Sequence, residues 1–478
     1  MGFKNHTVIA ECRRCLRAAT PLIAAQLVQT SHGLVDAMVA ARLGRAEFAA
    51  AGLAASLWFF ASLLCIGLLA GLSPLAAELI GQKNRSAVGA LFRQGLWLGL
   101  ILGCSACAIL LGGMLTLHHW GLDPELIPLV RAHAFTASWG LIAVAIVIAC
   151  RNICEATQIT RVVFVVTVLG LFVNLLGNLG LGLGWFGLPR LELTGIGIST
   201  TLVSFCMMVA LLFALRSKSF TRYKLFEEFS WPQAPVFKRL LALSIPIFFA
   251  LLFEAGLFGA TIVQMGTLGT LPTAAHTLAI SATSFCYMFP LGLSFALTAR
   301  VGQIYGTLGN STIHKKAQLQ FAGLQLRLLA GCILTVVFAL ATSLFLLIFR
   351  DAITGLYTQD QELRLFASRL LLFAAIFQFS DGAQATLIGM LRGLQDVRIP
   401  MLINAFSYWA IAFGIGSYLA HRAGWGAVGL WTGLICGLTL SAALLGARLL
   451  RVTSRQAKQK SMAGCAAEVR VVATKART

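Results

Sequence analysis

Residues 244–266 read SIPIFFALLFEAGLFGATIVQMG, and after the short break TLGTLPT, residues 274–306 read AAHTLAISATSFCYMFPLGLSFALTARVGQIYG. Each run is long enough to cross a bilayer, since about 20 apolar residues in a helix span the hydrocarbon core. The first run contains one carboxylate, Glu254, and a carboxylate near the middle of a membrane helix costs roughly 2.5 to 3.5 kcal/mol to insert. Such residues usually belong to an ion or proton pathway, so Glu254 is the first candidate functional residue.

The same stretch has a counterpart 225 residues earlier in the chain. Aligned without a gap, four pairs of Pro and Gly residues coincide: Pro246 with Pro21, Gly269 with Gly44, Gly292 with Gly67, and Gly306 with Gly81. Internal repeats within one hydrophobic chain are typical of transporters. We therefore predict two related halves.

The composition indicates a polytopic membrane protein. Of 478 residues, 58% are hydrophobic and only 11% are charged, and the mean hydropathy is +0.84. About 25% of the residues of a soluble domain are charged. The net charge of +20 could indicate nucleic-acid binding, but the basic residues alternate along the chain with the apolar runs. This pattern indicates membrane topology, so we expect a lipid bilayer and no nucleic acid as partner.

Apolar runs bounded by charged residues or by Gly and Pro predict twelve membrane-spanning helices, and thus an all-α integral membrane fold. Six spans in each half place the start of both halves on the same side, which makes the repeat parallel. The predicted spans are 18–40, 50–77, 94–113, 132–150, 162–183, 195–215, 240–266, 275–299, 328–349, 370–391, 399–420 and 425–447.

Lys and Arg are concentrated at the N-terminus, in the links after even-numbered spans and in the C-terminal tail. Because basic residues are retained on the cytoplasmic side, we expect both termini to be cytoplasmic. The expected organisation is a cytoplasmic segment (1–17), a six-helix bundle (18–215), a basic cytoplasmic linker (216–239), a second six-helix bundle (240–451) and a basic tail (452–478). The composition of the tail predicts disorder.

Three acidic residues lie deep in apolar runs: Asp36 in TSHGLVDAMVAA, Glu254 in LLFEAGLFGA, and Asp381 in AAIFQFSDGAQATLIG. We expect no Lys or Arg to lie deep enough in the membrane to pair with them. A buried carboxylate without a basic partner tends to hold a proton or to bind a cation, so we predict that these residues couple transport to a proton or cation. The alternative is a carboxyl group that only hydrogen-bonds between helices.

Amides accompany the acids on the same helices. Residues three or four apart share one helix face, which groups Asn174 with Asn178 and places Gln378 and Gln384 on either side of Asp381. Gln29 occupies the position in the first half that Glu254 has in the second. Aromatic rings that could stack on a flat cation are Phe253, Phe258, Tyr287 and Phe289, although packing in the bilayer is an alternative role for them.

Several of these segments together resemble one family. The run QTSHGLVDAMVAARLG, the stretch from FEAGLFGATIVQMG to VGQIYG, the turn FGLP, and FSDGAQATLIGMLRGLQDVRIPM followed by FSYW are similar to the multidrug and toxic compound extrusion (MATE) family, and most to its bacterial NorM-type branch. The resemblance extends from Pro21 to about Leu450.

The resemblance implies two six-helix bundles around a V-shaped central cavity, and export of small cationic amphiphilic compounds in exchange for inward Na⁺ or H⁺. It implies a transporter of the bacterial inner membrane rather than an enzyme, without a cofactor, and we expect a monomer. Asp36, Glu254 and Asp381 match the family's acids of the first, seventh and tenth helices, and Asn174 and Asn178 its fifth-helix amides. Possible Na⁺ ligands are Glu254, Asp381 and Asn178.

The chain departs from the family pattern at Phe377, one turn before Asp381, where NorM-type members often have Tyr. Without the hydroxyl, this position has no side-chain oxygen that could coordinate Na⁺.

Two other functions remain open. A lipid-linked oligosaccharide or lipid flippase of the same superfamily would favour additional spans and a basic interior. An integral membrane transferase would need a loop with paired Asp residues or a phosphate-binding basic cluster, and the predicted outer loops are short and nearly uncharged.

Overall fold

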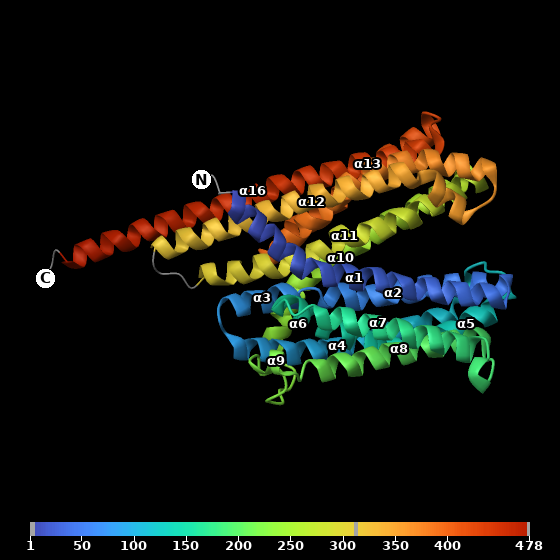
Figure 1. Ribbon diagram of the computed structural model, residues 1–478, viewed down its shortest axis with the longest axis horizontal. Helices are drawn as coiled ribbons and strands as arrows, with labels where there is room; N and C mark the ends of the chain where they lie inside the picture. Colours follow the sequence, from blue (N-terminus) through green and yellow to red (C-terminus); the bar gives the residue numbers. More distant parts are fainter. Residues whose placement is uncertain (1–4, 310–313, 476–478) are drawn as a thin grey trace. The chain divides into compact units, whose positions relative to one another are not determined.

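The computed structural model describes the backbone of residues 5–309 and 314–475, and the side chains within 6–308 and 319–455. Every regular element in the described part is helical (Figure 1). The first half comprises α1 (Asn5–Leu43), α2 (Arg45–Leu69), α3 (Leu72–Gly81), α4 (Arg85–Leu115), η1 (Leu117–His119), α5 (Leu126–Ser138), α6 (Gly140–Thr157), α7 (Arg161–Gly177), η2 (Asn178–Gly182), η3 (Trp185–Gly187), α8 (Glu192–Ala214) and α9 (Lys218–Thr221).

The second half continues with α10 (Ala234–Leu268), α11 (Thr270–Gly309), α12 (His314–Tyr357), α13 (Gln361–Gly393), α14 (Arg398–Ala405), η4 (Phe406–Phe413), α15 (Gly414–Ser417), η5 (Tyr418–Arg422) and α16 (Gly426–Lys475). Segments η2, η4 and η5 are π-helical, whereas η1 and η3 are 3₁₀ turns.

Eleven helices of the described part are long and apolar enough to cross a membrane, and they coincide with predicted spans 2 to 12. The predicted first span lies inside α1, which is more polar than the other eleven. The all-helical membrane fold predicted from the sequence is therefore confirmed.

The chain divides into two compact units, each assembled from segments that are distant in sequence. The N-terminal unit contains Thr20–Ala76 and Asn84–Leu251, and the C-terminal unit contains Met1–Ala19, Ala77–Lys83 and Leu252–Thr478. These boundaries differ from the expected ones, because the first nineteen residues belong with the second half and the linker and first half of α10 belong with the first. The tail expected to be disordered continues the helical backbone of α16 to Lys475, and its last three residues lie outside the described part.

An ion pair explains why the start of α1 belongs to the C-terminal unit. The carboxylate of Glu11 is only 4% exposed and accepts a hydrogen bond from the guanidinium of Arg300 on α11. The Nε atom of Arg327 on α12 lies 3.6 Å from the same carboxylate oxygen. Losing one member of a buried ion pair leaves an uncompensated charge, so removing Arg300 or Glu11 alone would destabilise the packing of α1 against α11 and α12.

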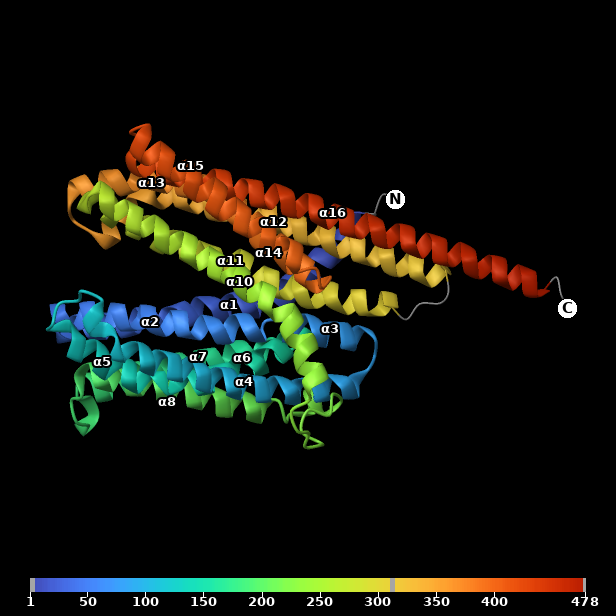
Figure 2. The ribbon, with the colours of Figure 1, turned by 180° about the vertical axis from the view of Figure 1, so that it is seen from behind.

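The N-terminal unit is a helical bundle in which α8 packs against α5, α6 and α7, and α2 packs against α4, α5 and α6. Figure 2 shows α4, α7 and α8 running nearly parallel. Asn152 on α6 donates to the carbonyl of Leu69 at the end of α2 (3.0 Å), which satisfies a helix-terminal acceptor inside the bundle.

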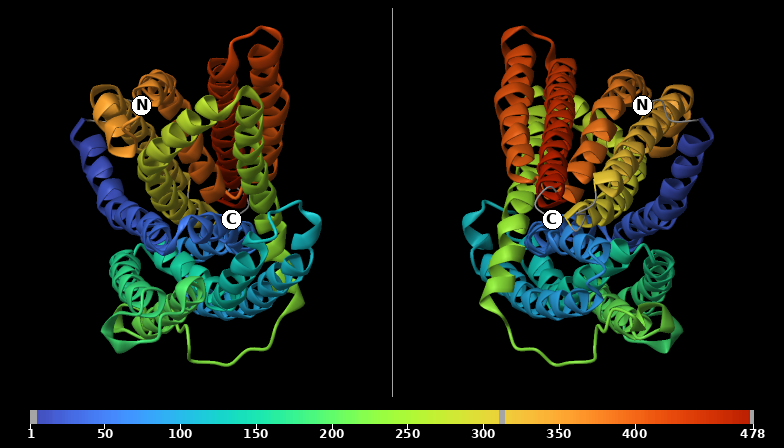
Figure 3. Two further views of the ribbon diagram at one scale, coloured as in Figure 1. Left: turned by 90° about the vertical axis from the view of Figure 1, so that its right-hand side faces the viewer. Right: turned by 90° about the vertical axis from the view of Figure 1, so that its left-hand side faces the viewer.

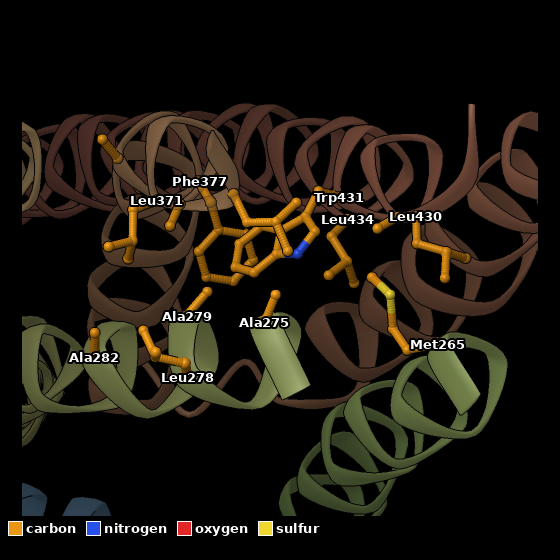
Figure 4. Packing of buried hydrophobic residues seen from close by; sticks show 14 of the residues in the cluster. Met265, Ala275, Leu278, Ala279, Ala282, Leu371, Phe377, Leu430, Trp431 and Leu434 are labelled. Atoms are coloured by element: carbon orange, nitrogen blue, oxygen red, sulfur yellow. The ribbon is translucent and has the colours of Figure 1, made fainter. Parts of the chain in front are cut away.

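The C-terminal unit is organised around α13, which packs against α11, α12 and α16. The side chain of Phe377 on α13 is 2% exposed and meets Trp431 of α16 edge-to-face, with 5.8 Å between ring centroids (Figure 4). Around this pair lie the small and aliphatic side chains of α11, among them Ala275, Leu278 and Ala279. The aromatic pair and these neighbours form the core that fixes α13 in place.

Glycines on one face of α16 allow η4 and η5 to approach closely. Gly429, Gly433 and Gly437 are spaced four apart and share that face. A Cβ atom at Gly433 would collide with the backbone of Gly416 and with the carbonyl oxygen of Ala412. Small residues at this spacing are a common device for packing membrane helices, because backbones can then touch.

We expect Gly433→Val to lower the melting temperature of the detergent-solubilised protein. Overpacking a tight contact costs about 1 to 3 kcal/mol, and here the opposing atoms are backbone and cannot rotate away. Thermal unfolding followed by tryptophan fluorescence measures the effect.

Gly446→Ala on the same helix is the control for that experiment, since a Cβ there meets nothing closer than 4.0 Å. Equal melting temperatures for the Gly433→Val variant and the parent would contradict the assigned packing of α16.

Candidate functional site

The N-terminal unit holds Asp36 in a cradle of two amides. Asn174, near the end of α7, donates to Oδ1 of Asp36 (2.9 Å), and Asn178, the first residue of η2, donates to the same oxygen (2.6 Å). Both asparagines are buried, whereas Asp36 on α1 is partly exposed. The sequence analysis placed the two amides on one face, and the structure brings both to Asp36.

The amide cradle has unused acceptors. The side-chain oxygens of Asn174 and Asn178 are buried and have no hydrogen-bond partner among the described residues. The π-helical turn η2 begins at Asn178, and its backbone carbonyl accepts from the nitrogen of Leu183, five residues later (3.3 Å). π-Helical turns are frequent at functional sites, because they shift side chains relative to a regular helix.

The C-terminal unit brings Glu254 and Asp381 together from different helices. The hydroxyl of Tyr287 on α11 donates to Oε1 of Glu254 on α10 (3.4 Å). Asp381 on α13 is 5% exposed, and its carboxyl group is close enough to that of Glu254 for the two to repel each other when both are ionised. Two neighbouring carboxyls cannot both carry a full charge in a membrane protein's interior without cost, so this pair is suited to binding a proton or a small cation.

The sequence analysis expected no Lys or Arg to pair with the three deep acids, and no ion pair to Asp36, Glu254 or Asp381 is found among the described residues. Arg392, eleven residues after Asp381 on α13, lies near enough to Glu254 for a favourable Coulombic interaction without an ion pair between the two.

Tyr408 on η4 is a residue of this site that the sequence analysis did not single out. Its ring is 1% exposed, and its hydroxyl is hydrogen-bonded to the side-chain amide of Gln384, one turn after Asp381. The ring lies within electrostatic range of Glu254 and Asp381. The available signal was the position of Gln384, because a buried amide on the same face as an acid requires a hydrogen-bond partner.

The other predicted polar residues have separate roles. Gln378 donates to the carbonyl of Thr283 on α11 (3.1 Å) and so connects two helices of the C-terminal unit. Gln29 on α1 is exposed, and no hydrogen bond of its side chain is found within the described residues. In the described part, no three or more His, Cys, Asp or Glu side chains are grouped as metal ligands would be.

Of the four aromatic candidates, the three phenylalanines pack against apolar side chains, whereas the tyrosine contacts a carboxyl group. Phe253 and Phe258 pack on the hydrophobic core of the C-terminal unit, where Phe258 meets Phe377 edge-to-face at 6.3 Å. Phe289 packs on Phe338 of α12 at 5.8 Å. The hydroxyl of Tyr287 donates a hydrogen bond to Glu254.

Comparison with known proteins begins with a family model, MatE, that matches residues 21–179 and again residues 246–416. The two matches begin 225 residues apart, which is the offset of the repeat found in the sequence. The related halves are thus two copies of one family domain.

Relatives of full length carry the name multidrug resistance protein NorM, in several cases with the prefix "Probable". The protein of Shewanella oneidensis is 33% identical over 447 residues, covering 92% of this chain and 94% of its own. That of Xanthomonas campestris pv. campestris is 34% identical, covering 94% of this chain and 95% of its own. That of Aliivibrio fischeri is 30% identical over 451 residues.

Solved structures agree on the fold. The crystal structure of a eukaryotic MATE transporter matches with a TM-score of 0.83 at 18% identity, covering 96% of this chain and 100% of that one. A MATE in the bent conformation matches with a TM-score of 0.83 at 19% identity, covering 95% and 98%. With a family model matched over both halves and full-length relatives above 30% identity, the chain belongs to the MatE family, the MATE membrane transporters.

Proposed function

We propose that the protein is a secondary active antiporter that exports organic cations of several kinds in exchange for inward movement of Na⁺ or H⁺. The observation that carries the proposal is the proximity of Glu254 and Asp381, with the hydroxyl of Tyr287 on Glu254. The names of the relatives, which are multidrug resistance proteins, support efflux as the direction and a broad substrate range.

The proposed mechanism is mutual exclusion at the carboxyl pair. When the pair is open to the outside, it takes up a proton or Na⁺ and releases the organic cation. When it is open to the cytosol, it releases the ion and binds the next organic cation. Inward movement of one elementary charge supplies about 2.3 kcal/mol per 100 mV, which corresponds to roughly a fifty-fold substrate gradient if the exchanged load carries no net charge.

Asp36 supplies a second place where a proton or cation can bind in this scheme. The unpartnered side-chain oxygens of Asn174 and Asn178 lie on the same two amides that donate to Asp36. Rotation of either amide would turn its oxygen instead of its NH₂ group toward Asp36. The two amides can therefore accommodate either an ionised carboxylate with a bound cation or a protonated carboxyl group. Na⁺ ligation is part of the same proposal, by Glu254 and Asp381 in the C-terminal unit and separately by Asn178 beside Asp36 in the N-terminal unit.

The remaining parts of the proposal concern location and assembly. The protein would work as a monomer in the bacterial inner membrane with both termini in the cytoplasm, supported by the distribution of Lys and Arg along the chain. No cofactor is required, because the ion gradient supplies the free energy. The alternative, a flippase for lipid-linked oligosaccharides, would predict transport that survives neutralisation of the acids.

We expect Glu254→Gln and Asp381→Asn each to reduce transport of ethidium at least tenfold, because each removes a group that must exchange a proton or cation. The measurement is ethidium uptake into everted membrane vesicles with an imposed gradient of either H⁺ or Na⁺. The gradient that drives the parent protein identifies the coupling ion.

The control for these variants is Glu362→Gln, which removes an exposed carboxylate from the first turn of the same helix as Asp381. The mechanism is rejected if both buried-acid variants transport as fast as the parent under either gradient.

A second prediction concerns the hydroxyl that Phe377 lacks. We expect Tyr408→Phe to raise the half-saturating concentration of the coupling ion roughly two- to tenfold, which corresponds to the loss of one hydrogen bond. Adding Phe377→Tyr to that variant should recover part of the loss, because it returns a hydroxyl to the turn before Asp381. The half-saturating concentration of the coupling ion is the quantity to compare.

Tyr418→Phe is the matched control, because Tyr418 is 64% exposed on the neighbouring π-helical segment. An unaltered half-saturating ion concentration in Tyr408→Phe would show that Tyr408 is only a packing residue.

A further inference from the structure

The segment between α8 and α10, residues 216–233, is bound along the side of α4, and we call it the strap. Figure 3 shows it in light green, leaving α8 and returning to α10. Three of its side chains are buried against the N-terminal unit: Phe220 (1% exposed), Tyr223 (3%) and Leu225 (3%). The sequence analysis predicted a basic cytoplasmic linker at residues 216–239, and the structure shows that the strap, which makes up most of it, packs against the N-terminal unit.

Hydrogen bonds from one face of α4 hold the strap backbone. Gln94 donates to the carbonyl of Trp231 (2.9 Å) and accepts from the nitrogen of Gln233 (2.7 Å). Trp97 donates to the carbonyl of Ser230 (3.0 Å), and Arg93 donates to the carbonyl of Lys224 (3.1 Å). The strap therefore has a defined inner and outer side.

Two large aromatic rings lie on the outer side of the strap. Phe229 is 73% exposed and Trp231 is 72% exposed, although their ring centroids are only 5.3 Å apart. Trp231 also stacks on Trp97 at 6.2 Å, so its position is fixed from below by α4. Because the backbone is held on both sides of this pair, the rings cannot turn inward into the bundle.

The strap carries a net positive charge. Its two acids are paired, Glu227 with Lys224 (2.8 Å) and Glu228 with Arg93 of α4 (3.8 Å). Three exposed cations have no acidic partner in the described part of the chain: Arg216, Lys218 and Arg222. Arg216 lies over the ring of Phe226 (5.5 Å) and Arg222 over that of Tyr223 (4.8 Å), which positions both guanidinium groups.

We propose that the strap is a binding site for anionic phospholipid in the leaflet on its side of the membrane, which we propose to be the cytoplasmic one. Trp and other aromatic side chains are favoured at the boundary between the hydrocarbon core and the lipid headgroups. There the apolar ring contacts lipid while its polar edge stays hydrated. Basic residues within a Debye length of the surface attract anionic headgroups. The site thus combines two inserted rings, Phe229 and Trp231, with the cations of Arg216, Lys218 and Arg222.

The test uses the full-length protein in liposomes of phosphatidylcholine that contain equal mole fractions of either brominated phosphatidylcholine or brominated phosphatidylglycerol. Bromine quenches nearby tryptophan, and the signal of Trp231 is the difference between the parent and Trp231→Phe. We expect brominated phosphatidylglycerol to quench Trp231 at least twofold more strongly than brominated phosphatidylcholine.

In the triple variant Arg216→Gln, Lys218→Gln, Arg222→Gln, the excess quenching of Trp231 by brominated phosphatidylglycerol should disappear. Each basic residue near the surface contributes roughly a fivefold preference for anionic lipid. Arg422→Gln, an exposed cation outside the strap, should leave the excess unchanged. Melting temperatures of the variants in detergent verify that they are folded.

Three results would overturn the proposal: equal quenching by the two lipids, no quenching by either, or an excess that survives in the folded triple variant. None of these depends on transport, so failure here is separable from failure of the antiport mechanism.

Discussion

A polar group within a membrane must find its partners inside the protein, because the hydrocarbon around it offers none. This requirement is severe for a carboxyl group, and Asp36 and Glu254 meet it differently. Asp36 has two amide donors, whereas Glu254 accepts from a phenol and is attracted by the guanidinium of Arg392. The helices that supply these groups are thereby fixed relative to the acids within each unit.

The same requirement explains the irregular backbone near the acids. Segments η2 and η4 are π-helical, and they carry Asn178 and Tyr408 at or near their first residues. A π-helical turn inserts one residue relative to the α-helical repeat and turns the following side chains to a new direction. At Asn178 the backbone carbonyl still has a partner after the change of direction, the nitrogen of Leu183.

Much of the architecture followed from the sequence, because twenty-residue apolar runs and the alternation of basic links are properties of the chain itself. The repeat, the helical fold and the three acids were all found in this way. Contacts between helices were not predictable, because they depend on crossing points that no single helix encodes. Tyr408 was not singled out for that reason, and because its helix has no periodic pattern that marks the ring as inward-facing. The packing of the strap against α4 was not predictable, because its aromatic residues alternate with charged ones and show no helical or strand period.

The glycine face of α16 has a consequence for how sequence changes in this protein would be interpreted. It holds η4 by backbone contact, and η4 presents the phenol that meets Gln384 beside Asp381. A methyl group added at Gly437 would press on Ala412 and on the carbonyl of Ser407, and would displace the segment that carries that phenol without touching an ionisable group. Under the antiport mechanism proposed above, a variant with such a substitution would differ from the parent in the ion gradient it requires, and a search restricted to charged positions would overlook the cause.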